Sequence, residues 1–369
     1  MTRRKLVTGK RYSTGARAAQ LIAAGLPDSW RIVLIDRNSY PESQTYILPR
    51  LAVLAGHEHK ASHIQSLGPN SVKLSHAFPE HGIDSDTLHF DYAIYALGSH
   101  LPSPLNLWHA APDGKPSVQS YGGSKAESIA WLRGKQRAIE DANSVLVVGG
   151  GALEFPTDIA AVYPGKPVML LHSRTRLLPR FDSEMHTEIL QAMESANINV
   201  ILSERLDLLS STSGHSTVRT TTGRIIHADL VLLCTGQRPN TELLQSLDSC
   251  TVNTNTALAQ VLRTMQLEEE EEEEEDLSTP YPHIFAIGDA ANAFGAIPAG
   301  HNAYYQAEVA ARNVLQLVHV KTDEPLERYT PGPPAIKVSL GLKKNVYQVN
   351  SVVGVGKETQ DDLNAAVIW

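Results

Sequence analysis

Three consecutive glycines after an apolar run form the motif with the clearest chemistry in this chain. The run Ser144–Val148 predicts a buried strand, and it leads directly into Gly149, Gly150 and Gly151. Glycines at such a turn let the backbone approach a pyrophosphate, and the N–H groups of the following helix point at its charge. A glycine-rich turn alone is a weak signal, but this one lies between a predicted strand and a predicted helix. The segment therefore predicts a dinucleotide-binding loop.

The end of the next predicted strand, at His172-Ser173-Arg174, is where a side chain that contacts the adenosine ribose should lie. It follows the first glycine by 172 − 149 = 23 residues. A carboxylate at this place favours NADH, whereas Ser173 and Arg174 are suited to a 2′-phosphate. The alternative, an ordinary surface arginine near a strand end, is equally open.

A second dinucleotide site is indicated near the N-terminus. Gly9 follows a short predicted strand, Gly15 opens an alanine-rich helix, and Asp36 ends the next strand 36 − 15 = 21 residues later. This spacing suits a carboxylate that accepts hydrogen bonds from ribose hydroxyls. The loop between the glycines carries bulky side chains, so an ordinary strand–helix–strand unit with Asp36 as a cap is the alternative.

A third motif is the run Ile284–Ile287, which delivers Gly288 and Asp289 to a sheet edge. Gly288 allows a ligand to approach closely, and Asp289 is suited to hydrogen-bond a ribityl hydroxyl. The alternative is a turn glycine with a capping aspartate. The alanine-rich helix predicted over 300–313 would direct its positive end at a flavin and stabilise the anionic reduced ring.

The elements that must position these residues alternate along the chain. Apolar runs predict strands at 31–36, 90–97, 144–148, 168–172, 228–235 and 283–287, and helices are predicted over 16–25 and 182–196, the latter capped by Asp182. The alternation predicts an α/β fold with parallel sheets covered by helices on both faces. Residues 102–121 predict a loop, and 266–282, with its run of eight glutamates, a flexible surface insert.

Length, net charge and cysteine content exclude several classes of function. A length of 369 residues predicts two or three domains, and a net charge of −8 without a basic tract argues against nucleic acid. Cys234 and Cys250, 250 − 234 = 16 residues apart, are the only cysteines, which excludes a disulfide scaffold and a redox dithiol and favours the cytoplasm. No apolar run is long enough to span a membrane. The triplet His57-Glu58-His59 lacks the spacing of metal ligands, and no metal is expected.

Together these segments resemble the pyridine nucleotide-disulfide oxidoreductase superfamily, and within it the apoptosis-inducing-factor-like and ferroptosis-suppressor-like NAD(P)H oxidoreductases. The matching segments, in conserved order over nearly the whole chain, include RIVLIDRNSY, FDYAIYALGS, SVLVVGGGALEF, LVLLCTGQRPN and HIFAIGDAAN. The resemblance implies two Rossmann-like dinucleotide-binding domains, for FAD and for NAD(P)H, and a small C-terminal segment. The implied boundaries are 1–118 and 240–325 for FAD, 119–239 for NAD(P)H and 326–369 for the C-terminal segment.

The resemblance also assigns cofactor-binding positions. For FAD these are Gly9, Gly15, Asp36, Arg37, Arg50, Lys60, Gly98, Gly288 and Asp289. For NADH or NADPH they are Gly149, Gly150, Gly151, Glu154, Ser173, Arg174 and Gly236. No acid–base residue is expected to be essential, because the flavin supplies the chemistry.

Both glycine loops depart from the family pattern. The first, GKRYSTG, is one residue longer, and the second, GGGALEFPTD, lacks a glycine and a valine before Glu154. The shorter loop places Pro156 where only the first turn of a helix tolerates it. The expected activity is hydride transfer from NAD(P)H to FAD, followed by electron transfer to a quinone-like or other small acceptor, with peripheral membrane contact left open. The alternative is a non-catalytic flavoprotein relative that acts as a binding protein.

Overall fold

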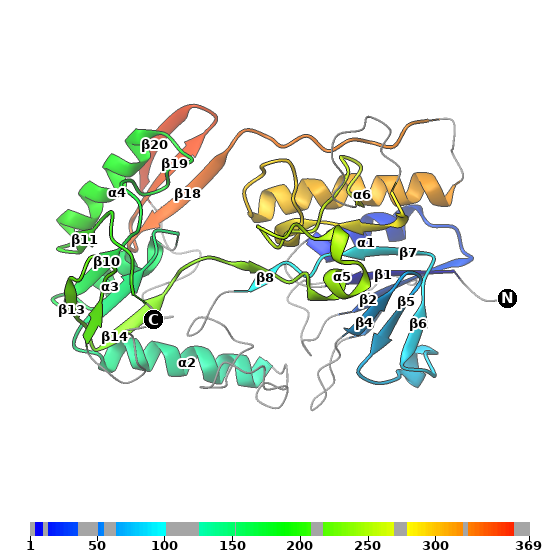
Figure 1. The fold of residues 1–369 in the computed structure, drawn as a ribbon, viewed down its shortest axis with the longest axis horizontal. Helices are drawn as coiled ribbons and strands as arrows, with labels where there is room; N and C mark the ends of the chain where they lie inside the picture. Colours follow the sequence, from blue (N-terminus) through cyan, green and yellow to red (C-terminus); the bar gives the residue numbers. More distant parts are fainter. Residues whose placement is uncertain are drawn as a thin grey trace. The chain divides into compact units, whose positions relative to one another are not determined.

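The computed structural model describes residues 4–9, 14–35, 51–54, 64–100, 125–151, 153–207, 217–268, 279–319 and 324–357 (Figure 1). The chain divides into two compact units. The first comprises residues 1–100, 116–128 and 238–332, and the second comprises 101–115, 129–237 and 333–369. Both units are α/β, and each contains a sheet whose strands are all or mostly parallel.

The first unit is built on a six-stranded sheet in the order β16-β17-β7-β1-β2-β3. Its strands are β1 (Arg4–Gly9), β2 (Trp30–Ile35), β3 (Leu51–Leu54), β7 (Tyr92–Tyr95), β16 (Gln266–Leu267) and β17 (Tyr281–Ala286). All neighbours are parallel except β16 and β17. Gly9 pairs with Ile35, and Tyr95 pairs with Ala286. The carboxyl ends of β1, β2, β7 and β17 therefore lie along one edge.

Two helices, α1 (Thr14–Gly25) and α6 (Gly300–Val318), pack side by side in this unit (Figure 1). Alanines fill much of their buried faces, including Ala18, Ala19, Ala307 and Ala310. At the end of α1, a Cβ on Gly25 would lie only 2.8 Å from a methyl carbon of Leu315. Small side chains thus let the two helices approach closely.

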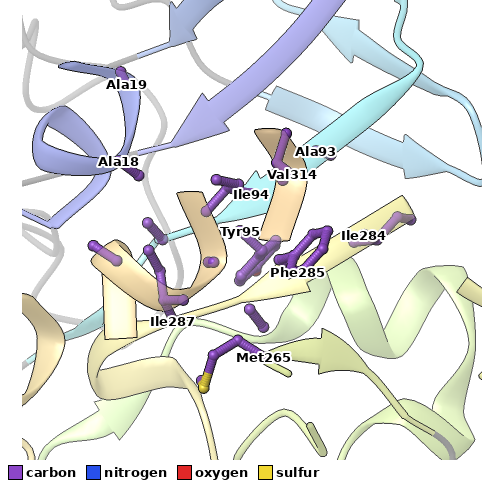
Figure 2. Packing of buried hydrophobic residues seen from close by; sticks show 14 of the residues in the cluster. Ala18, Ala19, Ala93, Ile94, Tyr95, Met265, Ile284, Phe285, Ile287 and Val314 are labelled. Atoms are coloured by element: carbon purple, nitrogen blue, oxygen red, sulfur yellow. The ribbon is translucent and has the colours of Figure 1, made fainter. Parts of the chain in front are cut away.

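The core of the first unit brings together segments far apart in sequence (Figure 2). Phe285, Ile284 and Ile94 from adjacent strands share one cluster with Met265 and with Val314 of α6. An antiparallel sheet completes this core; it consists of β4 (Ile64–Gly68), β5 (Ser71–Leu74) and β6 (Thr87–His89). The expectation that helices cover both faces of the sheet is therefore only partly met in this unit. In β5, Val72 and Leu74 are buried and Lys73 is exposed, which is the alternation of a strand with one face on a core and the other in solvent.

Shorter elements finish the first unit. They are α5 (Glu242–Leu247), the two-residue strands β8 (Ser99–His100) and β15 (Arg238–Pro239), which pair with each other, and the 3₁₀ turns η1 (Pro79–His81), η2 (Ser249–Thr251) and η3 (Gly288–Ala290).

The second unit contains a four-stranded parallel sheet in the order β11-β10-β9-β14. Its strands are β9 (Val145–Val148), β10 (Val168–Leu171), β11 (Asn199–Ile201) and β14 (Leu230–Leu233), and a hairpin of β12 (Thr217–Arg219) and β13 (Ile225–His227) follows β11. Every residue of β9 is buried, as expected of a parallel strand covered on both faces.

The helices around this sheet are α2 (Lys125–Asp141), α3 (Glu154–Val162) and α4 (Ser183–Ser195). The predicted cap of α4 is confirmed, since the Asp182 carboxylate accepts a hydrogen bond from the Glu184 N–H at 2.9 Å. Lys166 Nζ donates to the carbonyls of Ile139 and Glu140, both at 2.8 Å, and so satisfies the last turn of α2.

A C-terminal antiparallel sheet packs on α3 and α4 within the second unit. It is formed by β18 (Ala335–Leu340), β19 (Lys344–Val349) and β20 (Val352–Lys357). Gln348 Oε1 accepts a hydrogen bond from the Asp182 N–H at 2.8 Å, which joins β19 to the start of α4.

The strands and helices predicted from apolar periodicity are confirmed, with ends that differ by a few residues. The interpretation of 266–282 as a surface insert is wrong at both ends, because Gln266 and Leu267 form β16 and Tyr281 and Pro282 begin β17. Leu267 is fully buried, and Gln266 Nε2 donates to the Pro282 carbonyl at 2.7 Å. Residues 269–278 and the predicted loop at 102–121 lie outside the described residues. Among the helices that are described, none is both long and apolar enough to cross a lipid bilayer.

Candidate functional site

The carboxyl edge of the first sheet collects the glycines that the sequence singled out. Gly9 ends β1, and Gly15 lies in the buried first turn of α1. Gly288 has a φ of +77°, and a Cβ placed on it would lie 3.8 Å from the Thr14 side chain. The Gly288-Asp289 turn therefore abuts the N-terminus of α1, although the two segments are far apart in the chain.

Asp289 supplies a half-buried carboxylate at this edge. The Ser99 hydroxyl donates a hydrogen bond to Asp289 Oδ2 at 3.1 Å, and no other bond to this side chain occurs within the described residues. Burial raises the pKa of the Asp289 carboxyl, and the hydrogen bond from Ser99 opposes this shift. The second carboxylate oxygen is thus suited to accept a bond from a ligand hydroxyl.

Gln306 of α6 holds the Gly288-Asp289 turn by a hydrogen bond. Its side-chain oxygen accepts the Gly288 N–H at 2.7 Å, and the residue is 3% exposed. Ser99 and Gln306 were not predicted from the sequence. For Gln306 the sequence offered a weak indication, because polar residues recur on the buried face of α6 at Asn302, Gln306 and Asn313.

Gly98 lies where two chain segments are tied together beside Asp289. It has a φ of +64°, and its carbonyl accepts the Asn240 N–H at 2.9 Å. Asn240 Nδ2 also donates to the Leu97 carbonyl at 2.9 Å, and the Tyr95 hydroxyl donates to the Asn240 carbonyl at 2.6 Å. These bonds hold Ser99 in place against Asp289.

This edge fits the ribityl and pyrophosphate parts of FAD. It offers the N-terminus of α1, a turn at Gly288 with positive φ, and the half-buried Asp289 carboxylate with acceptor capacity. Asp36, Arg37, Arg50 and Lys60, which the sequence also assigned to FAD, lie outside the described residues.

The second glycine cluster follows β9 in the other unit. Gly149 has a φ of +113°, and a Cβ on it would lie 2.4 Å from the Cys234 carbonyl oxygen, so only glycine fits. A Cβ on Gly150 would lie 2.8 Å from His172 Nδ1, whereas a Cβ on Gly151 would meet nothing within 4 Å. The turn thus has a packed side toward β14 and β10 and an open side at Gly151 that suits a pyrophosphate.

His172 lies directly against this turn. Its Nδ1 accepts the Gly150 N–H at 3.1 Å, and its Nε2 lies 3.1 Å from the Arg176 carbonyl oxygen. Burial lowers the pKa of the imidazole.

Ser173 and Arg174 are exposed on the segment that follows β10. Their neighbour Arg176 is engaged differently, because its guanidinium donates to the Phe181 carbonyl at 3.0 Å. The Arg174 carbonyl accepts the Ser203 N–H at 3.0 Å, and within the described residues its guanidinium makes no ion pair. A cation is therefore available at the place predicted for a 2′-phosphate.

Glu154 is the first residue of α3, and Pro156 lies in the first turn of that helix, where proline is tolerated. Burial raises the pKa of Glu154, and burial together with the Glu154 charge raises the pKa of Asp158 to about 6. Gly236, with a φ of +48°, is exposed between β14 and β15.

Both cysteines are free thiols. Cys234 is buried, which raises the pKa of its thiol to about 12, and Cys250 is exposed in the other unit. In the part of the chain that is described, no cluster of three or more histidine, cysteine, aspartate or glutamate residues is arranged to hold a metal ion.

Comparison with known proteins identifies the family and the fold. Residues 55–313 match the family model described as pyridine nucleotide-disulphide oxidoreductase. Fe-regulated protein 8 of Mycosarcoma maydis is 37% identical over 98% of this chain and 93% of that protein. Ferroptosis suppressor protein 1 of Taeniopygia guttata is 29% identical over 72% of this chain and 66% of that protein. A ferredoxin reductase from Rhodopseudomonas palustris, 17% identical, superposes with a TM-score of 0.64 over 94% of this chain and 81% of that one.

The family match spans most of the chain, including Gly98, the Gly149 turn and the Gly288-Asp289 turn, and the fold of the solved structure agrees with two Rossmann-like units. The chain therefore belongs to the pyridine nucleotide-disulphide oxidoreductase family, among apoptosis-inducing-factor-like relatives, and is an FAD-dependent oxidoreductase that uses NADH or NADPH.

Proposed function

We propose that this oxidoreductase passes electrons from its flavin directly to a quinone-like or other small acceptor, without a protein disulfide as an intermediate. The observation that carries this proposal is the state of the thiols. The chain has two cysteines, and they are not in a C-x-x-C motif. The Cys234 thiol is buried with a pKa raised to about 12, so very little thiolate forms near neutral pH.

The two units divide the cofactors between them in this proposal. The first unit binds FAD through the α1 N-terminus, Gly288 and Asp289, and the second binds NADH or NADPH through the Gly149 turn. We retain the boundaries 1–118 with 240–325, 119–239 and 326–369 for the FAD domain, the NAD(P)H domain and the C-terminal segment. When both cofactors are bound, a hydride passes from the nicotinamide to FAD, and the reduced flavin supplies electrons to the acceptor.

In this proposal the residues of the chain bind and orient the cofactors and stabilise negative charge on the flavin. Asp289 accepts from a ribityl hydroxyl, Gln306 and Ser99 hold the Gly288-Asp289 turn, and α6 directs its positive end toward negative charge on the flavin ring. Two free cysteines fit a reducing compartment such as the cytoplasm.

NADPH is our proposed preferred donor. Ser173 and Arg174 are exposed after β10, Arg174 makes no ion pair within the described residues, and no carboxylate occupies residues 172–176. A 2′-phosphate would gain a charge-assisted bond from Arg174, whereas NADH would not.

The decisive experiment follows the visible flavin absorption of FAD-saturated protein under anaerobic conditions. NADPH is expected to bleach the flavin faster than NADH, and a water-soluble short-chain benzoquinone should then restore the colour in a single rapid phase. Dioxygen and a small disulfide, added separately to the reduced protein, serve as competing acceptors. Failure of both nucleotides to bleach the flavin would contradict the activity. Rapid reoxidation by dioxygen, with none by the quinone, would replace the quinone-like acceptor by oxygen.

A further inference from the structure

We propose that His172 is a positioning residue of the nicotinamide-nucleotide site, whose neutral imidazole ties the glycine turn to the segment that contacts the adenosine ribose. This inference rests on the proposed assignment of that nucleotide to the second unit. It concerns a side chain that touches neither substrate nor flavin and acts through the backbone of Gly150 and Arg176.

Two hydrogen bonds carry the argument. His172 Nδ1 accepts the Gly150 N–H at 3.1 Å, and Nε2 lies 3.1 Å from the Arg176 carbonyl oxygen. His172 is 8% exposed, and its ring packs so closely that a Cβ on Gly150 would fall within 3.0 Å of three ring atoms. The imidazole is therefore a fixed spacer between the turn after β9 and the segment after β10.

The partners also fix the protonation state of the ring. A backbone N–H needs an unprotonated acceptor at Nδ1, and a carbonyl oxygen needs a proton on Nε2, so the ring is neutral and carries its proton on Nε2. Burial lowers the pKa of His172 from 6.5, the nearby charges of Arg174 and His186 lower it further, and the Arg176 carbonyl opposes them. Glu204 also lies near His172, since its backbone N–H donates a hydrogen bond to the His172 carbonyl. The Glu204 carboxylate is paired with the Arg224 guanidinium at 2.7 Å.

The segment beyond Arg176 is held by further bonds that depend on its position. Arg176 donates to the Phe181 carbonyl at 3.0 Å, and the Leu177 N–H donates to His186 Nδ1 at 3.1 Å. Ser173 and Arg174 are the exposed residues between His172 and this anchored stretch. His172 thus sets the position of the pyrophosphate loop and of the ribose-contacting segment with one side chain.

Protonation of Nδ1 would bring two donors face to face at Gly150 and release the turn. Nucleotide affinity should therefore be full near neutral pH and fall as the pH drops through the native pKa of His172, which lies below 6.5. His186 of α4 is the other imidazole that contacts this segment, so its contribution is separated from that of His172 by mutation.

The test is a calorimetric titration of FAD-saturated protein with ADP-ribose, which carries the pyrophosphate but neither the nicotinamide nor a 2′-phosphate. This choice removes the 2′-phosphate, which itself titrates near pH 6. His172→Ala should weaken binding about tenfold at pH 7.5, the effect of one lost hydrogen bond. His172→Asn, which keeps an acceptor near the Nδ1 position, should retain most of the affinity and lose the acid-dependent weakening. His172→Gln, which reaches toward the Arg176 carbonyl, should bind as weakly as His172→Ala.

The matched control is His186→Asn, which keeps an acceptor for Leu177 and should retain the wild-type pH profile. Nitrogen-15 spectra of histidine-labelled wild-type protein provide a readout that needs no variant: His172 should be neutral, with its proton on Nε2, at pH 6.5. A proton on Nδ1, or equal ADP-ribose affinity in wild type and His172→Ala, would overturn the role of His172 alone. No binding of ADP-ribose by the wild type at any pH would overturn the proposed nucleotide site and this inference together.

Discussion

Gly149 and Gly288 adopt positive φ angles at the two glycine turns, but their surroundings differ. At Gly149 the obstacle to a side chain is a carbonyl oxygen of the neighbouring strand connection, 2.4 Å from the place of a Cβ. At Gly288 a Cβ would find ordinary contacts near 3.7 Å, so the cost of a side chain there is the backbone conformation. The two turns therefore predict different responses to the same substitution.

Gly149→Ala should destabilise the second unit by about 2 kcal/mol or more, because it combines an unfavourable φ with a backbone clash. Denaturant unfolding followed by fluorescence measures this change. Gly151→Ala is the control, since a Cβ there meets nothing within 4 Å, and its unfolding midpoint should stay close to that of the wild type. Equal midpoints for both variants would show that the Gly149 turn is looser than described.

Arg174→Ala should lower kcat/KM for NADPH about tenfold and leave the value for NADH nearly unchanged, because only NADPH carries the phosphate that the guanidinium would contact. Steady-state reduction of a quinone with each donor gives the two values. Arg219→Ala, an exposed arginine on β12 of the same unit, controls for the loss of one positive charge. A parallel fall for both donors would assign Arg174 to general steering and not to donor choice.

At the scale of elements, α1 and α6 are joined by an ion pair as well as by small side chains. Arg17 Nη2 lies 2.5 Å from Glu308 Oε1, and Arg312, one turn further along α6, lies 3.6 Å from the other Glu308 oxygen. The hydrogen bond from Arg17 is the main reason that the pKa of Glu308 lies below its ordinary value of 4.5. The pair therefore helps to hold the N-terminus of α1 beside the Gly288-Asp289 turn.

Glu308→Gln should destabilise the protein at neutral pH, and a double-mutant cycle with Arg17→Ala should give a coupling of about 0.5–1 kcal/mol. Because the pKa of Glu308 is depressed in the folded state, its contribution is present above pH 4.5 and is lost as the pH falls through the folded pKa. Unfolding curves at neutral and acid pH should show the wild type and Glu308→Gln converging in acid. A difference that persists at pH 3 would assign the effect to packing.

At the scale of the whole molecule, the two glycine turns belong to separate compact units, each with its own sheet. A substitution that abolishes binding at the proposed FAD site should therefore leave binding at the proposed nicotinamide-nucleotide site intact, and the reverse should also hold. This separation distinguishes a damaged flavin site from a damaged nucleotide site in any variant.

Asp289→Asn should weaken FAD binding roughly tenfold to a hundredfold, since a hydrogen bond to a charged acceptor is worth about 1.5–3 kcal/mol. ADP-ribose binding to the second unit should be retained in this variant, whereas Gly149→Ala should show the reverse pattern. Flavin content after purification and calorimetry with ADP-ribose measure the two sites. Loss of both ligands in Asp289→Asn would mean that the units do not bind independently.

Several parallel strands were predicted well, because a strand buried on both faces is a continuous apolar run, but the parallel strands β3 and β11 were not predicted. Ser144–Val148 and Val168–His172 were such runs and became β9 and β10. The short strands β4, β5 and β6 were not predicted, since an alternating pattern over three to five residues is hard to distinguish from a loop. The same difficulty hid β16 at the start of the glutamate-rich segment.

By itself, the sequence determined the order of the glycine turns, the lack of a dithiol motif and the position of Asp289 after a strand. Only the tertiary structure decided which polar side chains meet there: Ser99 bonds Asp289 across 190 residues, Arg17 pairs with Glu308 across 291, and Gln306 receives the Gly288 N–H. It also turned His172 toward Gly150 and left Arg174 exposed. Such contacts depend on the order of strands in a sheet and on how closely helices approach, and these follow from packing of the whole unit, not from local residue patterns.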